Sequence, residues 1–85
     1  MGSYSVVLKR SAERELRALP RADLARVVKR IASLAENPRP QGSEKLAGAE
    51  QYRVRQGDYR IIYGVDDTAR IVEVVKIGHR REVYR

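Results

Sequence analysis

The chain lacks the residues that hold together or metallate many small proteins. Its 85 residues include no cysteine and one histidine. The absence of cysteine excludes a disulfide-stabilised secreted domain and a thiolate zinc site, and one histidine cannot build a metal centre. We therefore expect neither a metal nor another cofactor. No apolar run approaches the roughly 20 residues that span a bilayer, and no signal-peptide pattern is present. These absences predict a cytoplasmic protein without a membrane partner.

Acidic residues are also scarce relative to basic ones. The chain has 18 lysines and arginines against 11 acidic residues, which gives a formal net charge of +7. Of the basic residues 14 are arginine, whose planar guanidinium binds phosphate through two parallel hydrogen bonds. Such a surplus favours a polyanionic partner. The length allows one small domain, which we expect to occupy residues 1–85.

The first half of the chain has helical periodicity after a short strand. Residues 4–8 are rich in β-branched side chains and predict a strand. Ser11 is placed to cap a first helix, which Pro20 interrupts, and residues 21–36 predict a second helix. We expect a helical hairpin whose second helix buries one apolar stripe, made of Leu24, Val27, Val28, Ile31, Leu34 and Ala35.

The second half changes to the period of strands. Residues 51–56, 59–65 and 70–77 each read as a strand, and short turn sequences separate them. Three consecutive strands with short turns form an antiparallel meander. The sequence therefore predicts an α+β fold in which the helices pack on one face of a small, mainly antiparallel sheet.

Three arginines are predicted to share one face of the meander. Arg53 and Arg55 are two residues apart on one strand, so they point the same way, and Arg60 lies on the next strand. A two-residue turn with Gly57 in its second position would place Arg53 opposite Arg60 and Arg55 opposite Asp58. A three-residue turn would break this cluster. We favour the two-residue turn because glycine suits its second position.

Such a cluster has two interpretations. Like charges opposite each other destabilise a sheet, so a sequence that keeps them can be holding them for a polyanion. The alternative is that the arginines are merely solvated. The tyrosines at 52, 59 and 63 occupy the opposite face and fit packing against the helices better than stacking on bases. Arg26, Lys29 and Arg30 form a basic helix face, for which solvation and a grip on ribosomal RNA are both open readings.

Four sequence motifs resemble the RelE branch of the RelE/ParE toxin superfamily, and the similarity covers essentially the whole chain. The specific part is the last two motifs. The four are Leu46-Ala47-Gly48, Tyr52-Arg53-Val54-Arg55, Gly57-Asp58-Tyr59-Arg60-Ile61-Ile62-Tyr63 and Gly78-His79-Arg80-Arg81-Glu82-Val83-Tyr84.

The resemblance implies a toxin of a toxin–antitoxin pair that cuts mRNA in the ribosomal A site. The family's reaction is attack of a ribose 2′-hydroxyl on the adjacent phosphate, without a metal. The implied catalytic residues are Arg53, Arg55, Arg60, Arg80 and Tyr84, of which Tyr84 stacks on an mRNA base; Arg81 joins them in binding RNA. These roles suit phosphoryl transfer, which depends mainly on positioning and charge stabilisation.

One departure from the family concerns the general base. Well-known members have lysines where this chain has Arg53 and Arg55, and an arginine with a pKa above about 12 does not give up its proton. Either no strong base is used or another group serves. The first candidate is His79, because histidine is the residue type that most often acts as a base in proteins, although a solvated histidine in a basic tail is the simpler interpretation. Glu82 and Tyr84 are weaker candidates.

The resemblance also implies partners and leaves two rivals. The partners are an acidic RelB-like antitoxin, the ribosome with its mRNA, and operator DNA only through the antitoxin complex. The first rival is a ParE-like toxin that binds DNA gyrase and cuts nothing, since it shares the fold. The second is a non-catalytic nucleic-acid-binding module, because phosphate binding by arginine requires no chemistry.

Overall fold

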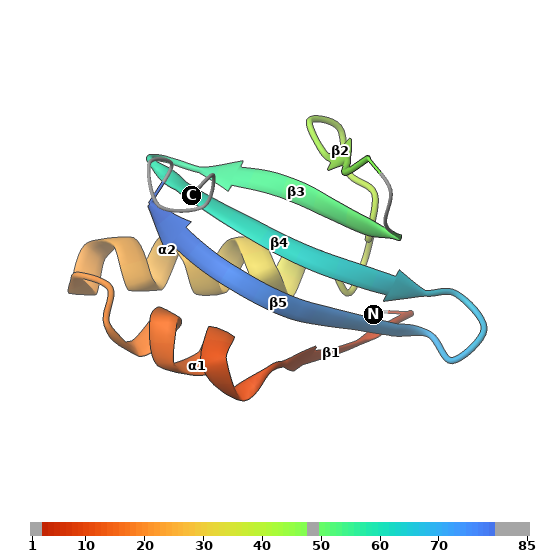
Figure 1. Cartoon of the computed structure of the whole chain (residues 1–85), viewed down its shortest axis with the longest axis horizontal. Helices are drawn as coiled ribbons and strands as arrows, with labels where there is room; N and C mark the ends of the chain where they lie inside the picture. The colour runs from red at the N-terminus through yellow and green to blue at the C-terminus, as the bar shows by residue number, and fades with distance from the viewer. Residues whose placement is uncertain (1–2, 48–49, 80–85) are drawn as a thin grey trace.

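The computed structural model describes residues 3–47 and 50–79 as one sheet and two helices. The order is β1 (Ser5–Leu8), α1 (Arg10–Arg17), α2 (Arg21–Ser33), β2 (Glu44–Lys45), β3 (Gln51–Gln56), β4 (Tyr59–Asp66) and β5 (Ile71–His79). Figure 1 shows α2 crossing behind the long strands, with α1 along the β1 side of the sheet. The predicted α+β fold is confirmed. Neither helix has the length and apolar character needed to cross a membrane.

The five strands lie in the order β1-β5-β4-β3-β2. β1 pairs with β5 in parallel, and every other neighbouring pair is antiparallel. The meander of β3, β4 and β5 is therefore as predicted, and β4 is its central strand. The two-residue strand β2 was not predicted. It pairs with Tyr52 and Arg53 at the outer edge of β3.

The core lies between the helices and one face of the sheet. Its ten buried apolar side chains are Ala12, Val27, Ile31, Leu34, Val54, Ile61, Tyr63, Val72, Val74 and Ile77. Most of the predicted stripe of α2 is at least partly buried. Val28 is the exception, with 45% of its surface exposed. Its assignment to the core is wrong, because it lies at the margin of a stripe that covers a narrow sheet.

The start of α1 and the end of α2 both differ from the sequence expectation. Ser11 is exposed inside α1, and Lys9 occupies the N-cap without a side-chain bond. The predicted Ser11 cap is wrong because the Lys9 N–H still donates to the Val74 carbonyl at 2.9 Å, so the chain enters the helix directly from the sheet. The second helix ends at Ser33. The next residues form a tighter turn, with the Leu34 N–H donating to the Ile31 carbonyl.

A carboxylate of α1 covers the open edge of β5. β1 pairs only with Ile71 to Val74, so the end of β5 extends beyond it. There the Ile77 N–H donates to Oε1 of Glu15 at 3.0 Å, and Lys76 Nζ lies 3.5 Å from Oε2. The Glu15 side chain thus replaces a missing strand and fixes α1 against the sheet.

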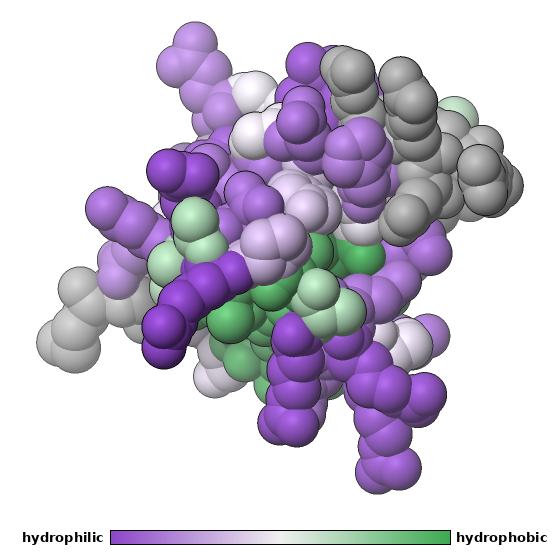
Figure 2. Space-filling model, turned by 90° about the vertical axis from the view of Figure 1, so that its left-hand side faces the viewer, coloured by the Kyte–Doolittle hydropathy of each residue, from purple (hydrophilic) through white to green (hydrophobic). Residues whose placement is uncertain are grey.

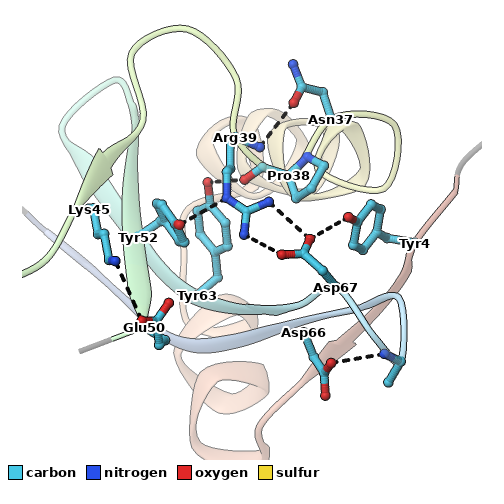
Figure 3. Close-up of polar contacts among 11 residues, drawn as sticks. Tyr4, Asn37, Pro38, Arg39, Lys45, Glu50, Tyr52, Tyr63, Asp66 and Asp67 are labelled. Carbon is cyan, nitrogen blue, oxygen red and sulfur yellow. Dashed lines mark hydrogen bonds and ion pairs between the residues drawn. The ribbon is translucent and has the colours of Figure 1, made fainter.

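A polar network fastens the opposite end of the molecule, shown in Figure 3. The guanidinium of Arg39 donates through both terminal nitrogens to Asp67, at 3.1 and 2.8 Å, and through Nε to the Tyr52 hydroxyl at 2.9 Å. The Tyr4 hydroxyl donates to the same carboxylate at 2.6 Å. One arginine therefore joins the loop after α2, the β4–β5 turn and β3, and Asp67 adds the segment before β1.

Two tyrosines connect this network to the core. The Tyr63 ring is completely buried, and its hydroxyl donates to the Pro38 carbonyl at 2.7 Å. The Tyr52 ring stacks on it with 5.9 Å between ring centroids. The expectation that these tyrosines pack on the helix side of the sheet is confirmed, because Tyr63 lies in the core and Tyr52 packs against it. Burial raises the pKa of the Tyr63 hydroxyl above its usual value, which keeps it a hydrogen-bond donor at neutral pH.

The ion pair controls the titration of Asp67. Hydrogen bonds from Arg39 first, and from Tyr4 second, lower the pKa of Asp67 from 3.8 to about 2. Its pKa in the folded protein is thus lower than in the unfolded chain. The resulting stabilisation is complete above the unfolded pKa and is lost as the pH falls towards the folded pKa.

We expect Asp67→Asn to lower the thermal unfolding midpoint at pH 7, and this deficit to shrink as the pH falls from about 4 to 2, where wild-type Asp67 becomes protonated. Thermal unfolding followed by circular dichroism at several pH values measures both. Asp66→Asn is the matched control, since among the described residues this carboxylate accepts a hydrogen bond only from the Ala69 N–H. A deficit that stays constant down to pH 2 would contradict the role of the ion pair.

Glu15→Ala should lower the free energy of unfolding by about 1–3 kcal/mol, because it leaves the partly buried Ile77 N–H without an acceptor. Glu15→Gln keeps an acceptor oxygen and should lose much less, since the half-exposed ion pair with Lys76 contributes little. Urea unfolding measures both variants, with Glu13→Ala as a control on the same helix. Equal losses for the two Glu15 variants would show that charge, rather than the acceptor, is what matters.

Candidate functional site

The β3–β4 hairpin gathers Arg53, Arg55 and Arg60 on the sheet face that the helices leave open. Their register differs from the prediction. Arg55 pairs with Arg60 and Arg53 with Ile62, so the expected pairs of Arg53 with Arg60 and of Arg55 with Asp58 are wrong. Residues opposite each other point to the same side of a sheet, and so do residues two apart. The cluster therefore exists, with Arg55 and Arg60 directly opposed.

The glycine of the turn explains the changed register. The two turn residues are Gly57 and Asp58, between paired Gln56 and Tyr59. Gly57 has a φ of +61°, whereas Asp58 does not have a positive φ. This is a primed turn with glycine in the first central position instead of the second. Moving the turn by one residue moves the partner of every residue on β3 by two, which preserves the face.

The three guanidinium groups have different environments. Arg60 lies on the central strand and is 6% exposed, and its Nη1 lies 3.4 Å from the Tyr59 carbonyl. The Arg53 side chain is 14% exposed and forms an ion pair at 2.7 Å with Glu44 of β2. Arg55 is exposed and forms no ion pair with any described residue. Arg55 is therefore the guanidinium most available to an incoming phosphate, with a buried positive charge beside it.

Two residues that position the cluster were not singled out from the sequence. Glu44 holds Arg53, and only the pairing of β2 with β3 brings them together. Gly78 pairs with Arg60 from β5. The glycine could have been suspected from its place in a resembling motif. Glu44 stands in a two-residue strand that no periodicity reveals.

His79 lies on the other face of the sheet. It pairs with Tyr59, whose ring it meets edge-on with 5.9 Å between centroids, and Tyr59 points towards the helices. Both residues line a surface hollow where β5 ends beside the α1–α2 turn, together with Glu15, Ala18, Leu19, Pro20, Ile77 and Gly78. Figure 2 looks onto this end and shows apolar surface surrounded by hydrophilic side chains. The structure thus separates His79 from the three arginines.

The remaining predicted site residues follow β5 directly. Arg80, Arg81, Glu82 and Tyr84 lie outside the described residues. The last two residues of β5, Gly78 and His79, pair with Arg60 and Tyr59 of β4.

Known proteins resemble this chain over nearly its full length. The family model for the ParE toxin of the parDE type II toxin–antitoxin system matches residues 6–84. Toxin RelG of Mycobacterium tuberculosis is 34% identical, and the match covers 96% of this chain and 97% of that protein. Toxin RelE of the same organism is 33% identical over 96% of this chain and 87% of its own length.

Solved structures agree with the sequence matches. A chain of the RelBE2 toxin–antitoxin complex from Mycobacterium tuberculosis superposes with a TM-score of 0.82 at 30% identity, over 96% of this chain and 97% of its own. A chain of the RelE–RelB complex from Pyrococcus horikoshii gives 0.83 at 29% identity, over 94% and 98%. With this fold and these relatives, the chain belongs to the RelE/ParE family of type II toxins, within its RelE branch.

Proposed function

We propose that this toxin cleaves mRNA in the ribosomal A site. The observation that carries the proposal is the opposition of Arg55 and Arg60 on the open face of the sheet, where two like charges face each other on neighbouring strands. Two guanidinium groups held on neighbouring strands can bind one anion between them. A phosphate diester is such an anion, and the resembling family supplies the further expectation that Arg80 and Tyr84 take part.

In the proposed reaction the ribose 2′-oxygen forms a bond to phosphorus as the bond from phosphorus to the 5′-oxygen breaks. The products are a 2′,3′-cyclic phosphate and a 5′-hydroxyl, and the proton lost by the 2′-hydroxyl is balanced by one gained at the leaving oxygen. Arg55 binds a non-bridging oxygen, and Arg60 adds positive charge beside it from a rigid strand. Both stabilise the charge that builds up in the transition state.

The roles of the other residues follow from their positions. Arg53 is held by Glu44, so it orients and supports the phosphate site from one side. Arg80 and Arg81 add RNA contacts, and Tyr84 stacks on an mRNA base. None of the arginines serves as a base, since each keeps its proton at neutral pH. His79 stands on the helix-covered face, so the proposal gives it no contact with the phosphate.

We also propose that an acidic RelB-like antitoxin neutralises the toxin. The relatives from Mycobacterium tuberculosis and Pyrococcus horikoshii were crystallised in toxin–antitoxin and RelE–RelB complexes. The +7 charge of this chain favours an acidic partner that folds as it binds. Operator DNA is then bound only through the toxin–antitoxin complex.

Arg55→Ala should slow single-turnover cleavage of a programmed A-site codon roughly ten- to hundred-fold, because a charge-assisted hydrogen bond is worth about 1.5–3 kcal/mol. Its thermal midpoint should stay near that of the wild type, since the side chain is exposed. Arg55→Lys keeps the charge but cannot form two parallel hydrogen bonds, so its cleavage rate should lie between those of the wild type and of Arg55→Ala. Arg21→Ala removes an exposed arginine elsewhere and is the control. Equal rates for the Arg55→Ala variant and the control would remove Arg55 from the site.

Tyr84→Ala should slow the same cleavage by about two orders of magnitude, from lost stacking and misaligned attack, while Tyr84→Phe keeps most of the rate. A gyrase supercoiling assay runs beside both. If the wild type inhibits supercoiling and never cuts programmed mRNA, the ParE-like rival is correct. If it binds nucleic acid but does neither, it is a non-catalytic module.

A further inference from the structure

An acidic side chain lies at the edge of the arginine cluster that Arg53, Arg55 and Arg60 form. Glu44 of β2 pairs with Arg53 of β3, so both side chains point to the open face of the sheet. Oε2 of Glu44 accepts a hydrogen bond from Nη2 of Arg53 at 2.7 Å. The Arg53 side chain is 14% exposed and that of Glu44 60%, so the carboxylate meets a largely buried guanidinium from the solvent side. A carboxylate in this place repels the phosphate that the arginines attract.

Backbone hydrogen bonds fix β2 on both sides. Before it, the Ser43 N–H donates to the Pro40 carbonyl at 3.0 Å, in a turn where Gly42 has a φ of +92°. Such a φ favours glycine over residues with a side chain. After it, the Leu46 N–H donates to the Gln51 carbonyl at 2.8 Å, which continues the pairing with β3. The two-residue strand is therefore held in place despite its short length.

The loop that leads to β2 is anchored as well. The guanidinium of Arg39 binds the Asp67 carboxylate and the Tyr52 hydroxyl, which fastens the loop to the β4–β5 turn and to β3 (Figure 3). Glu44 therefore projects from a backbone that is tied to the sheet before and after it. A carboxylate fixed in this way can set the direction of the long Arg53 side chain.

Repulsion within the cluster makes this bond important. Arg53 lies two residues from Arg55 on β3 and diagonally across from Arg60 on β4. Diagonal neighbours of a sheet lie about 7–8 Å apart, which long side chains can bridge, so these guanidinium groups repel each other. Glu44, on the outer side of Arg53, offsets this repulsion and orders the guanidinium before RNA arrives. An ordered side chain loses less freedom when the transition state forms.

We propose that Glu44 is a positioning residue of the phosphate site, which raises the rate of cleavage through Arg53 and weakens the binding of RNA at the same time. The inference rests on the proposed function, because it takes the scissile phosphate as the ligand of the arginine cluster. A guanidinium has five N–H donors, so Arg53 can keep its bond to Glu44 while it contacts a phosphate. The orientation of Arg53 benefits the transition state, whereas the repulsion between carboxylate and phosphate already acts when RNA binds.

The test is a double-mutant cycle in single-turnover cleavage of a programmed A-site codon, with the toxin concentration varied. Glu44→Ala should lower the rate at saturation roughly ten-fold, because the guanidinium of Arg53 is no longer oriented. The toxin concentration at half saturation should stay the same or fall about two- to five-fold, because a negative charge near the phosphate is gone. In an Arg53→Ala background, Glu44→Ala should cause no further loss of rate, since it acts through Arg53. Glu50→Ala is the matched control, because it removes an exposed carboxylate that pairs with Lys45 of β2 instead, and it should keep the wild-type rate.

The outcomes separate this inference from the proposed function. If Glu44→Ala keeps the wild-type rate, or slows the wild type and Arg53→Ala equally, Glu44 does not act through Arg53 and the inference is overturned while the cleavage proposal stands. Slower cleavage with weaker binding would also overturn it, because that result indicates damage to the RNA site. A wild type that never cuts programmed mRNA would end both.

Thermal unfolding checks that the variants are folded. Glu44→Ala should unfold near the wild-type temperature, because the ion pair is partly exposed and contributes little to stability. If it does not fold, Glu44→Gln takes its place in the cycle. The amide of Glu44→Gln keeps an acceptor oxygen for Arg53 but has no charge, so its rate should lie between those of the wild type and of Arg53→Ala.

Discussion

A sheet covered on one face only is the constraint on which the rest of this structure depends. Alternate residues of β4 point either into the core or towards the open side, so Ile61 and Tyr63 are completely buried beside Arg60 on the same strand. Stability and the proposed anion binding therefore depend on alternate residues of the same segment. A one-residue slip in the pairing would exchange the two sets. The hydrogen bond of Glu15 to β5 and the ion pair of Arg39 with Asp67 matter because they fasten opposite ends of the sheet.

Much of the fold could be predicted because its signals are local. Period-2 and period-3.6 patterns placed two helices and four strands near their observed positions. What was missed depends on contacts between distant segments. Ser11 lost its capping role because Lys9 is still bonded to Val74 across the sheet, and β2 exists because Arg53 and Tyr52 offer a partner edge. Such tertiary contacts override local preference without leaving a mark in the sequence.

Part of the candidate site could also be predicted from a local pattern. Arg53, Arg55 and Arg60 share a face because side chains alternate along a strand. The error in the turn position does not change this face, because moving the turn by one residue shifts each pairing partner by two. Burial is different. Nothing in the sequence distinguishes the buried Arg60 from the exposed Arg55, since that difference arises from the central place of β4 between β5 and β3. His79 was considered as a general base for the chemistry of imidazole, which says nothing about the face of the sheet on which the residue lies.

The burial of Arg60 connects stability to the proposed chemistry. Removing a guanidinium from water is unfavourable, and the core on the other face of the sheet helps to offset this cost by holding β4 in place. In return, a charge on a central strand loses little freedom when it meets a phosphate, whereas a charge on a loop would lose much more. Arg55 on the outer strand can adjust to the ligand while Arg60 cannot. The pair thus combines a fixed charge with a movable one, an arrangement suited to recognising a phosphate whose geometry changes during reaction.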